Sequence, residues 1–237
     1  MTAHSDFQLF GLTHLASIGI ILGLAFAFVA VARSQRFQGW GQWIRFLLVF
    51  ILLGNELIGQ IVAIRKGLWS YEWGLPLQIC DLAIFTAAYS LFWHRQLIWE
   101  LTYFWGLAGT LQAILTPDLQ VTFPDPTYIK FFTTHGSILI SVIFLAAGCG
   151  RPIYSVSIKR VFWATNIYAL LIGFFNWILQ TNYGYLCEKP EQTSLLTYLG
   201  PWPFYLLTLE GVLFVSLWVY YAPYYVINKW KSKRRDL

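Results

Sequence analysis

Charged side chains are scarce in this sequence. Only 11% of its 237 residues are Asp, Glu, Lys or Arg, whereas a soluble domain averages roughly 25%. A chain with so few charges cannot cover a water-facing surface. Hydrophobic residues make up 57% of the sequence, and its mean hydropathy is +0.56. These values exclude an ordinary soluble domain and indicate that lipid is the natural solvent of this chain.

Cysteine and closely spaced histidine pairs are also scarce. Cys80, Cys149 and Cys187 form no C-x-x-C pair, and an odd number argues against a disulfide framework or a cysteine zinc site. No His-x-x-x-His spacing occurs, which disfavours a metal-dependent hydrolase. The possible ligands of such an enzyme are His14, His135, Asp81, Glu56 and Glu210. We expect no metal and no other cofactor.

What the sequence does contain is a series of long apolar runs. In lipid the backbone polar groups must pair internally, so only helices or a closed barrel can cross a membrane. Runs of about 18–22 residues suit helices that cross roughly 30 Å of hydrocarbon, whereas a barrel would alternate over about 10 residues. The predicted spans cover residues 11–32, 43–64, 75–93, 97–115, 130–148, 160–180 and 203–221. We predict an all-α, polytopic bundle of seven transmembrane helices, forming one integral membrane domain (1–237) in the cell membrane.

Prolines punctuate this pattern. Pro76 is expected in the first turn of the third span, where its missing N–H costs nothing. Pro201 and Pro203 are expected to open the seventh span, and Pro223 to close it.

Basic residues are distributed unevenly over the connections. Twelve of the sixteen fall on one side: Arg33, Arg36, Arg45, Arg95, Arg151, Lys159, Arg160, Lys229, Lys231, Lys233, Arg234 and Arg235. Cytoplasmic loops carry the excess of Lys and Arg in multi-pass proteins. We therefore expect a cytoplasmic C-terminus and, with seven spans, an N-terminus outside. This distribution accounts for the net charge of +5, so nucleic acid is not an expected partner.

Polar side chains occur within the predicted spans, although an ionisable group at the bilayer centre costs about 2.5–3.5 kcal/mol on the insertion scale. In the expected orientation the inner half contains mainly Asn166, and the others lie in the outer half. The outer set includes His14, Asn55, Glu56, Gln60, Gln78, Cys80, Asp81, Thr110, Gln112, Thr133, Thr134, His135, Asn176, Gln180, Asn182 and Glu210. This sorting predicts a polar cavity between the helices that opens toward the outer side.

Each of these residues also has a structural interpretation. His14 could be interfacial, and Glu56 and Glu210 could be protonated acids that bond between helices. Asn55 and Asn176 are suited to hydrogen bonds between helices, and a lone cysteine is usually a small buried hydrophobe. The candidates for substrate binding or orientation are His14, Asn55, Glu56, Gln78, Asp81, Gln112, Asn176 and Glu210.

Cys80 and His135 lie at similar predicted depth on separate spans. In acyl transfer, a histidine removes the proton of a cysteine thiol and the thiolate attacks an acyl carbonyl. Asp81, Glu56 or Glu210 could orient the imidazole as the third member of a triad does. Asn, Gln or Thr donors nearby would stabilise the oxyanion.

Four stretches resemble motifs of a known family. They are His14-Leu15, Leu75–Asp81 (LPLQICD), Thr181–Leu186 (TNYGYL) followed by Lys189-Pro190, and Gly200–Tyr205 (GPWPFY) leading to Glu210. Their order and spacing are similar to those of the transmembrane protein 164 family, which includes the bacterial YwaF-like membrane proteins. The resemblance implies a seven-span fold and, for the animal branch, a phospholipid acyltransferase that moves a fatty acyl chain between glycerophospholipids through a cysteine. It puts that cysteine at Cys80 and the family's fifth-span histidine at His135.

These observations lead to two candidate functions. The first is a membrane-embedded acyltransferase or acyl hydrolase that uses Cys80 and His135 on phospholipid acyl esters, with membrane phospholipid or lysophospholipid as its partner. The second is a small-solute transporter or substrate-binding membrane subunit that uses the same polar pocket, for which Glu56 and Glu210 would matter and Cys80 would not. The sequence shows no repeated halves of the kind many transporters have. A retinal-binding photoreceptor is excluded because the seventh span lacks a lysine.

Overall fold

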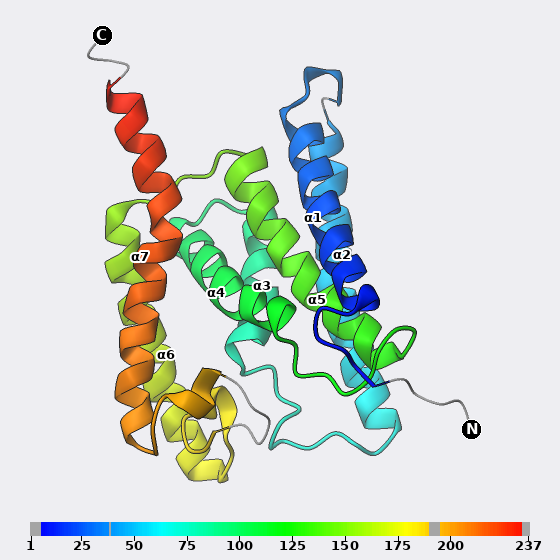
Figure 1. The fold of residues 1–237 in the computed structure, drawn as a ribbon, viewed down its shortest axis with the longest axis vertical. Helices are drawn as coiled ribbons and strands as arrows, with labels where there is room; N and C mark the ends of the chain where they lie inside the picture. Colours follow the sequence, from blue (N-terminus) through cyan, green and yellow to red (C-terminus); the bar gives the residue numbers. More distant parts are fainter. Residues whose placement is uncertain (1–5, 38, 190–194, 234–237) are drawn as a thin grey trace. The chain divides into compact units, whose positions relative to one another are not determined.

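The computed structural model describes residues 6–37, 39–189 and 195–233 (Figure 1). Pro190, Arg234 and Arg235, named above, lie outside these residues. Seven α-helices occur in the described part: α1 (Leu12–Arg33), α2 (Trp40–Arg65), α3 (Ile79–Phe92), α4 (Gln96–Leu115), α5 (Pro126–Ile143), α6 (Ser155–Leu179) and α7 (Phe204–Lys233). A π-helical turn, η2 (Phe144–Gly148), continues α5. Three short 3-10 helices lie at Gln35–Phe37 (η1), Tyr183–Tyr185 (η3) and Leu195–Tyr198 (η4).

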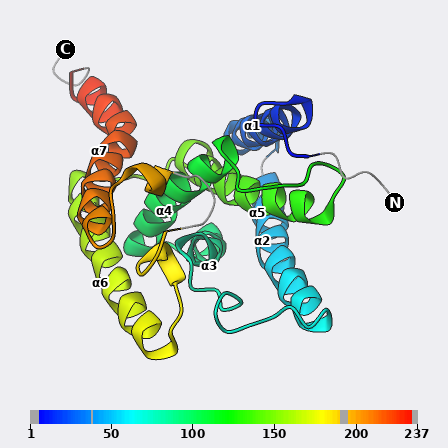
Figure 2. The same cartoon turned by 60° about the horizontal axis from the view of Figure 1, so that its bottom comes forward.

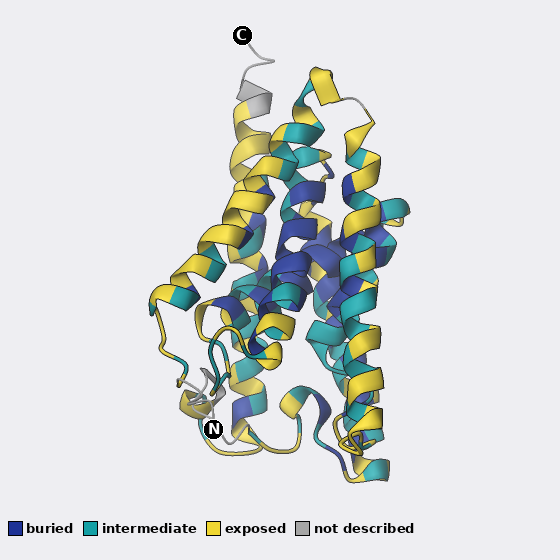
Figure 3. Cartoon of the chain, turned by 90° about the vertical axis from the view of Figure 1, so that its right-hand side faces the viewer, coloured by how far each residue is buried: buried dark blue, intermediate teal, exposed yellow. Residues whose placement is uncertain are grey.

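The predicted all-α class is confirmed. Five helices are long and apolar enough to cross a membrane, namely α1, α2, α5 with η2, α6 and α7. The other two do not meet both conditions, since α3 has only 14 residues and α4 contains polar residues throughout its 20. Large apolar side chains are exposed along the long helices, and α7, which leads to the C label, is mostly yellow in Figure 3. In a multi-pass membrane protein such surfaces face lipid.

Two expectations about prolines were wrong. Pro76 precedes α3, which begins at Ile79 and not at residue 75, because the residue before a proline is pushed out of the helical region and because hydrogen bonds from other side chains hold residues 75–78 in a bent, non-helical conformation. Pro223 lies inside α7, which continues to Lys233. Membrane helices tolerate proline where neighbouring groups satisfy the freed carbonyl.

The helix ends follow from local sequence. Asp125 is the N-cap of α5, accepting a hydrogen bond from the Thr127 N–H at 2.7 Å, and Pro126 follows it at the first helical position. Both residue types favour a helix start. At the far end of α6, Gln180 adopts a left-handed conformation with φ 53° and stops the helix.

The described chain divides into two compact units. Unit 1 contains Met1–Ser70 and Ile79–Arg151, and therefore α1 to α5. Unit 2 contains Tyr71–Gln78 and Pro152–Leu237, and therefore the segment before α3 together with α6 and α7.

Within unit 1, α3, α4 and α5 pack against one another, and α1 and α2 pack against α5. Figure 2 shows α3 almost end-on, with α4 beside it. Small residues allow the close approach: a Cβ on Gly106 of α4 would lie 2.8 Å from Val142 of α5, and one on Gly136 of α5 would lie 2.8 Å from Ile21 of α1. This use of glycine is typical of membrane helix interfaces. Every residue from Trp99 to Gly106 in α4 is buried.

Candidate active site

Cys80 is the second residue of α3, and its thiol faces α4. A Cβ built on Gly109 of α4 would lie only 2.9 Å from Cys80 Sγ. The sulfur therefore occupies the space that any larger residue at position 109 would need. The side chain is partly buried, and a thiol in such surroundings needs a base to form the nucleophilic thiolate.

His135 lies in the middle of α5 with its imidazole held in one orientation. Its Nδ1 is 2.9 Å from the carbonyl oxygen of Phe131, one turn earlier, and the two rings are 4.3 Å apart. Because a carbonyl only accepts, Nδ1 carries the proton in this bond. Nε2 of the neutral ring is then a free acceptor, which is the form that a general base requires.

The register of α4 against its neighbours puts Cys80 and His135 in one layer of unit 1, about two helical turns deep. Gly106 of α4 contacts Ile138 and Val142 of α5. Toward its other end, α4 is linked through His14 to Phe132, because His14 Nε2 bonds the carbonyl oxygen of Ile114 at 2.8 Å and its ring lies 5.7 Å from that of Phe132. The two helices are therefore antiparallel in this region.

Both candidate residues fall between these two contacts. Cys80 meets α4 at Gly109, between Gly106 and Ile114, and His135 lies between Phe132 and Ile138 on α5. They share a layer of about two helical turns. No hydrogen bond joins the thiol to the imidazole among the residues that the structure describes.

Asn55 of α2 fixes the turn of α5 that carries His135. Its Nδ2 donates to the carbonyl oxygen of Lys130 at 3.1 Å and to the hydroxyl of Thr134, the neighbour of His135. Asn55 therefore contributes to the site through the backbone and through Thr134.

Glu56 and Gln60 form a separate chain on the same helix. Glu56 Oε1 accepts from Gln60 Nε2 at 2.7 Å, and Gln60 Oε1 accepts from the indole N–H of Trp69 at 3.0 Å. The ammonium of Lys130 packs over Gly59, where a Cβ would lie 2.2 Å from Nζ. Glu56 and Gln60 are four residues apart on α2 and bond to each other, and the chain of bonds continues to Trp69.

The segment before Cys80 is held by two tyrosines of unit 2. The hydroxyl of Tyr183 accepts from the Leu75 N–H at 2.9 Å and donates to the Tyr71 carbonyl at 2.8 Å. The hydroxyl of Tyr168 donates to the Leu77 carbonyl at 2.8 Å. The backbone groups that an α-helix would have paired are thereby satisfied in a bent, non-helical segment.

Gln78 and Asn176 add further hydrogen bonds to those that hold residues 75–78. Gln78 Oε1 accepts from the Gly184 N–H at 2.9 Å. Asn176 is 1% exposed, and its Oδ1 accepts from the Thr181 hydroxyl and the Tyr183 N–H, both at 2.8 Å, while its Nδ2 donates to the Tyr183 carbonyl at 2.9 Å. The motif at residues 181–186 therefore binds the motif at residues 75–78, the entry to α3.

A family model matches residues 8–221, and its description is the TMEM164 family. The chain belongs to the TMEM164 family. The resemblance seen in the four sequence motifs is thus confirmed over most of the chain. No curated protein and no solved structure gives a significant match.

His14 has a structural position in this TMEM164-family protein. It is fully buried, and Nδ1 accepts from the Phe10 N–H at 2.9 Å. Nε2 must then carry the proton that it donates to the Ile114 carbonyl. Both ring nitrogens are used in joining the start of α1 to the end of α4.

Glu210 and Gln112 also differ from expectation. Glu210 Oε2 accepts from Asn166 Nδ2 at 3.1 Å, so these two residues share one level of the α6–α7 pair, although the sequence put them in opposite halves of the bilayer. The predicted placement of the polar residues in the outer half of the bilayer is therefore less complete than expected. Gln112 is exposed near the end of α4 and bonds Thr116.

Sequence reasoning missed several buried polar residues of the family fold. Glu100 of α4 is fully buried, and its Oε1 accepts from Gln96 Nε2 at 3.1 Å. Ser90 of α3 and Thr102 of α4 bond to each other at 2.9 Å, also fully buried. Glu100 lies within the predicted fourth span, and this position is the signal by which the sequence could have identified it.

Asp81, in the first turn of α3, is half-buried. Over the described ranges, no group of three His, Cys, Asp or Glu is arranged to hold a metal.

Proposed function

We propose that this TMEM164-family protein is a seven-span membrane enzyme that transfers or hydrolyses an acyl group of a phospholipid, with Cys80 as nucleophile and His135 as general base. The observation that carries the proposal is the state of His135. Its Nδ1–H is bound to the Phe131 carbonyl, which leaves Nε2 as a base in the same layer as the Cys80 thiol.

The chemistry would proceed in two halves. His135 Nε2 takes the proton of Cys80, and the thiolate attacks the acyl carbonyl of the lipid ester. When the tetrahedral intermediate collapses, the imidazolium returns the proton to the departing lipid oxygen, giving a lysophospholipid and a thioester on Cys80. In the second half His135 deprotonates a lysophospholipid hydroxyl or water, which attacks the thioester, and Cys80 leaves as the thiolate that recovers the proton.

The proposed topology has seven crossings, with the N-terminus outside and the C-terminus in the cytoplasm. The short helix α3 is compatible with a crossing. Its 14 residues cover about 21 Å at 1.5 Å per residue, and the non-helical residues 75–78 precede it in the chain. Irregular backbone at membrane depth is tolerated where protein groups satisfy it, and Tyr168, Tyr183 and Gln78 take part in such bonds here.

The experiment is labelling of the purified protein in lipid nanodiscs with a thiol-reactive acyl probe. We compare wild type with Cys80→Ala and His135→Gln, and use Cys149→Ala and Cys187→Ala as controls because both of those cysteines are exposed. The proposal requires labelling that is lost in Cys80→Ala, falls at least roughly tenfold in His135→Gln, and stays unchanged in the controls. Labelling of Cys80→Ala at the wild-type rate would disprove the nucleophile assignment.

A second candidate function is binding of a small polar solute. It is favoured by the chain from Glu56 through Gln60 to Trp69, whose bonds run along the C-terminal half of α2. For this function, Glu56→Gln would abolish solute binding while Cys80→Ala would leave it unchanged. The acyl-transfer proposal requires the opposite ranking of these two variants in the labelling assay.

A further inference from the structure

A cavity lies in unit 1, away from Cys80 and His135. Its volume is about 430 Å³, and its lining includes Ser34, Phe37, Gly41, Gln42, Arg45 and Phe92. Cys80 is at the start of α3 and Phe92 at its end, so twelve residues, or about 18 Å of helix, separate this cavity from the thiol. The cavity is therefore distinct from the proposed active site.

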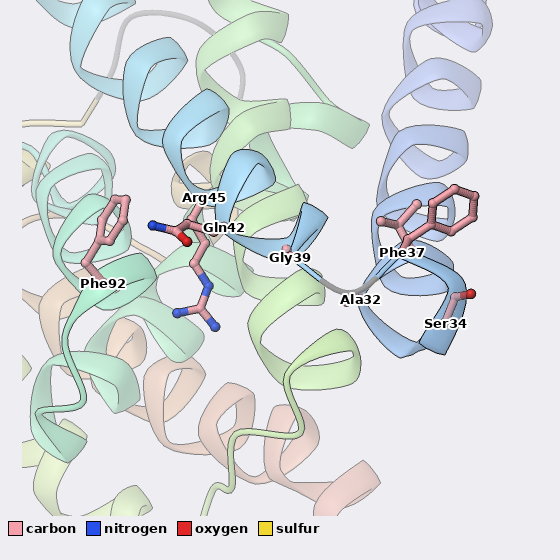
Figure 4. A pocket seen from close by; sticks show the side chains of 9 residues that line it. Ala32, Ser34, Phe37, Gly39, Gln42, Arg45 and Phe92 are labelled. Atoms are coloured by element: carbon pink, nitrogen blue, oxygen red, sulfur yellow. The ribbon is translucent and has the colours of Figure 1, made fainter.

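Arg45 of α2 supplies the charge of this cavity. Its Nη1 donates to the carbonyl oxygen of Leu91 at 3.1 Å, and its Nη2 lies 3.5 Å from Cys149 Sγ. A guanidinium carries five N–H donors, so two are used and three remain for a ligand. In Figure 4, Arg45 and Gln42 lie between Phe92 and Gly39.

The surroundings add positive charge. Arg33, Arg36 and Arg45 occur within thirteen residues, and the sequence contains no Asp or Glu between Asp6 and Glu56. Arg33 bonds the Ala147 carbonyl at 2.8 Å, and the guanidinium of Arg36 lies 5.8 Å from the centre of the Phe37 ring. An anion at this end of unit 1 would meet a cationic environment and no neighbouring carboxylate from the α1–α2 connection.

The lining is also partly apolar. Val31, Ala32, Phe37 and Phe92 form part of the wall beside the polar groups of Ser34, Gln42 and Arg45. A cavity with an apolar wall and a few convergent polar groups suits an amphiphilic ligand. A guanidinium binds phosphate oxygens in a bidentate geometry.

We propose that this cavity binds a phosphate group, with Arg45 as its main partner and the headgroup of a glycerophospholipid as its source. In the proposed topology the cavity lies at the cytoplasmic side, opposite the thiol. The lipid would be an accessory ligand and not the acyl substrate. A soluble phosphate has the same chemistry, and the experiment separates the two sources.

The test is native mass spectrometry of the full chain in detergent, titrated with dioleoylphosphatidylglycerol, with dioleoylglycerol as the lipid that lacks phosphate and with inorganic phosphate as competitor. We expect a saturable phospholipid site that depends on Arg45, in addition to substrate binding near Cys80, no equivalent site for dioleoylglycerol, and no displacement of the Arg45-dependent lipid by millimolar inorganic phosphate. Displacement at that concentration would assign the site to soluble phosphate and overturn the lipid source.

Two variants address the cavity itself. Arg45→Gln should raise the Kd at least tenfold, whereas Arg65→Gln, at the other end of α2, should not change it. Gly41→Leu should block binding by filling the cavity, because a Cβ there meets nothing within 4 Å and no clash is expected. Gly54→Leu is its control, since that glycine also has open space but does not line the cavity.

Unchanged binding in Arg45→Gln, or equal losses in Arg45→Gln and Arg65→Gln, would overturn the proposal. If Arg45→Gln does not fold, Gly41→Leu decides, and wild-type binding by that variant rejects the cavity. Cys80→Ala should bind the phospholipid as wild type does, so failure of this site and failure of the proposed acyl chemistry are distinguished.

Discussion

The hydroxyl of Tyr183 accepts a hydrogen bond from the backbone N–H of Leu75 at 2.9 Å, five residues before Cys80. Tyr183 is fully buried, and Asn176 fixes its backbone through both N–H and carbonyl. Two motifs that are more than 100 residues apart in the sequence therefore form one structural element. Its effect is to set the conformation in which the chain enters α3.

The first prediction concerns this hydroxyl. Tyr183→Phe removes the partner of the Leu75 N–H and of the Tyr71 carbonyl, and an unsatisfied buried group costs about 1–3 kcal/mol. We expect a lower Tm in detergent and slower acyl-probe labelling of Cys80, with the helix content unchanged by circular dichroism. Tyr198→Phe is the control because Tyr198 is 77% exposed. Equal Tm values for the two variants would show that the hydrogen bonds of the Tyr183 hydroxyl do not stabilise the entry to α3.

The second prediction separates the two buried histidines. His14 uses both ring nitrogens in structural bonds, whereas the hydrogen bond of His135 to the Phe131 carbonyl uses only Nδ1. His14→Ala should lower stability by about 1–3 kcal/mol and leave the labelling rate of the folded fraction near that of wild type. His135→Gln should leave the stability near that of wild type and lower the labelling rate. The two readouts are Tm and the labelling rate after size-exclusion chromatography, and a parallel loss of both in each variant contradicts the division of roles.

Sequence reasoning predicted the helices well because hydropathy reports directly on the length of each apolar run. It failed at Pro76, where the side chains that hold the non-helical segment belong to Tyr168 and Tyr183, about 90 to 110 residues later. Depth along a predicted span could bring Cys80 and His135 to a common level, but it could not give the tautomer of His135, which depends on the Phe131 carbonyl. It also could not distinguish His14 from His135, since only the packed structure shows which ring nitrogens are engaged. The pairing of Glu210 with Asn166 was missed because a helix start shifted by a few residues changes the inferred depth.

The third prediction tests the contact between Cys80 and α4. A methyl group at Gly109 would lie 2.9 Å from Cys80 Sγ, closer than a carbon and a sulfur can approach. Gly109→Ala should therefore displace the thiol from the layer of His135 and reduce the labelling rate at least roughly tenfold, because small misplacements of reacting groups are costly. Gly23→Ala of α1 is the matched control, since nothing lies within 4 Å of its added Cβ. Thiol titration in denaturant verifies that Cys80 remains reduced, and equal labelling of the two variants would mean that α3 adjusts without loss.

The last prediction concerns pH and the connection between α3 and α4. His94 Nδ1 lies 2.9 Å from Arg151 Nη2. The charge of Arg151, followed by burial and the charge of Arg45, lowers the pKa of His94 below its ordinary 6.5. The folded protein therefore binds this proton less readily than the unfolded chain does, so its stability is full above about pH 6.5 and falls as the pH drops through and below that value. Tm measured from pH 7.5 to pH 5 should decrease more in wild type than in His94→Asn, which cannot be protonated. Identical slopes for the two proteins would show that His94 does not contribute, because every other titrating group is common to both.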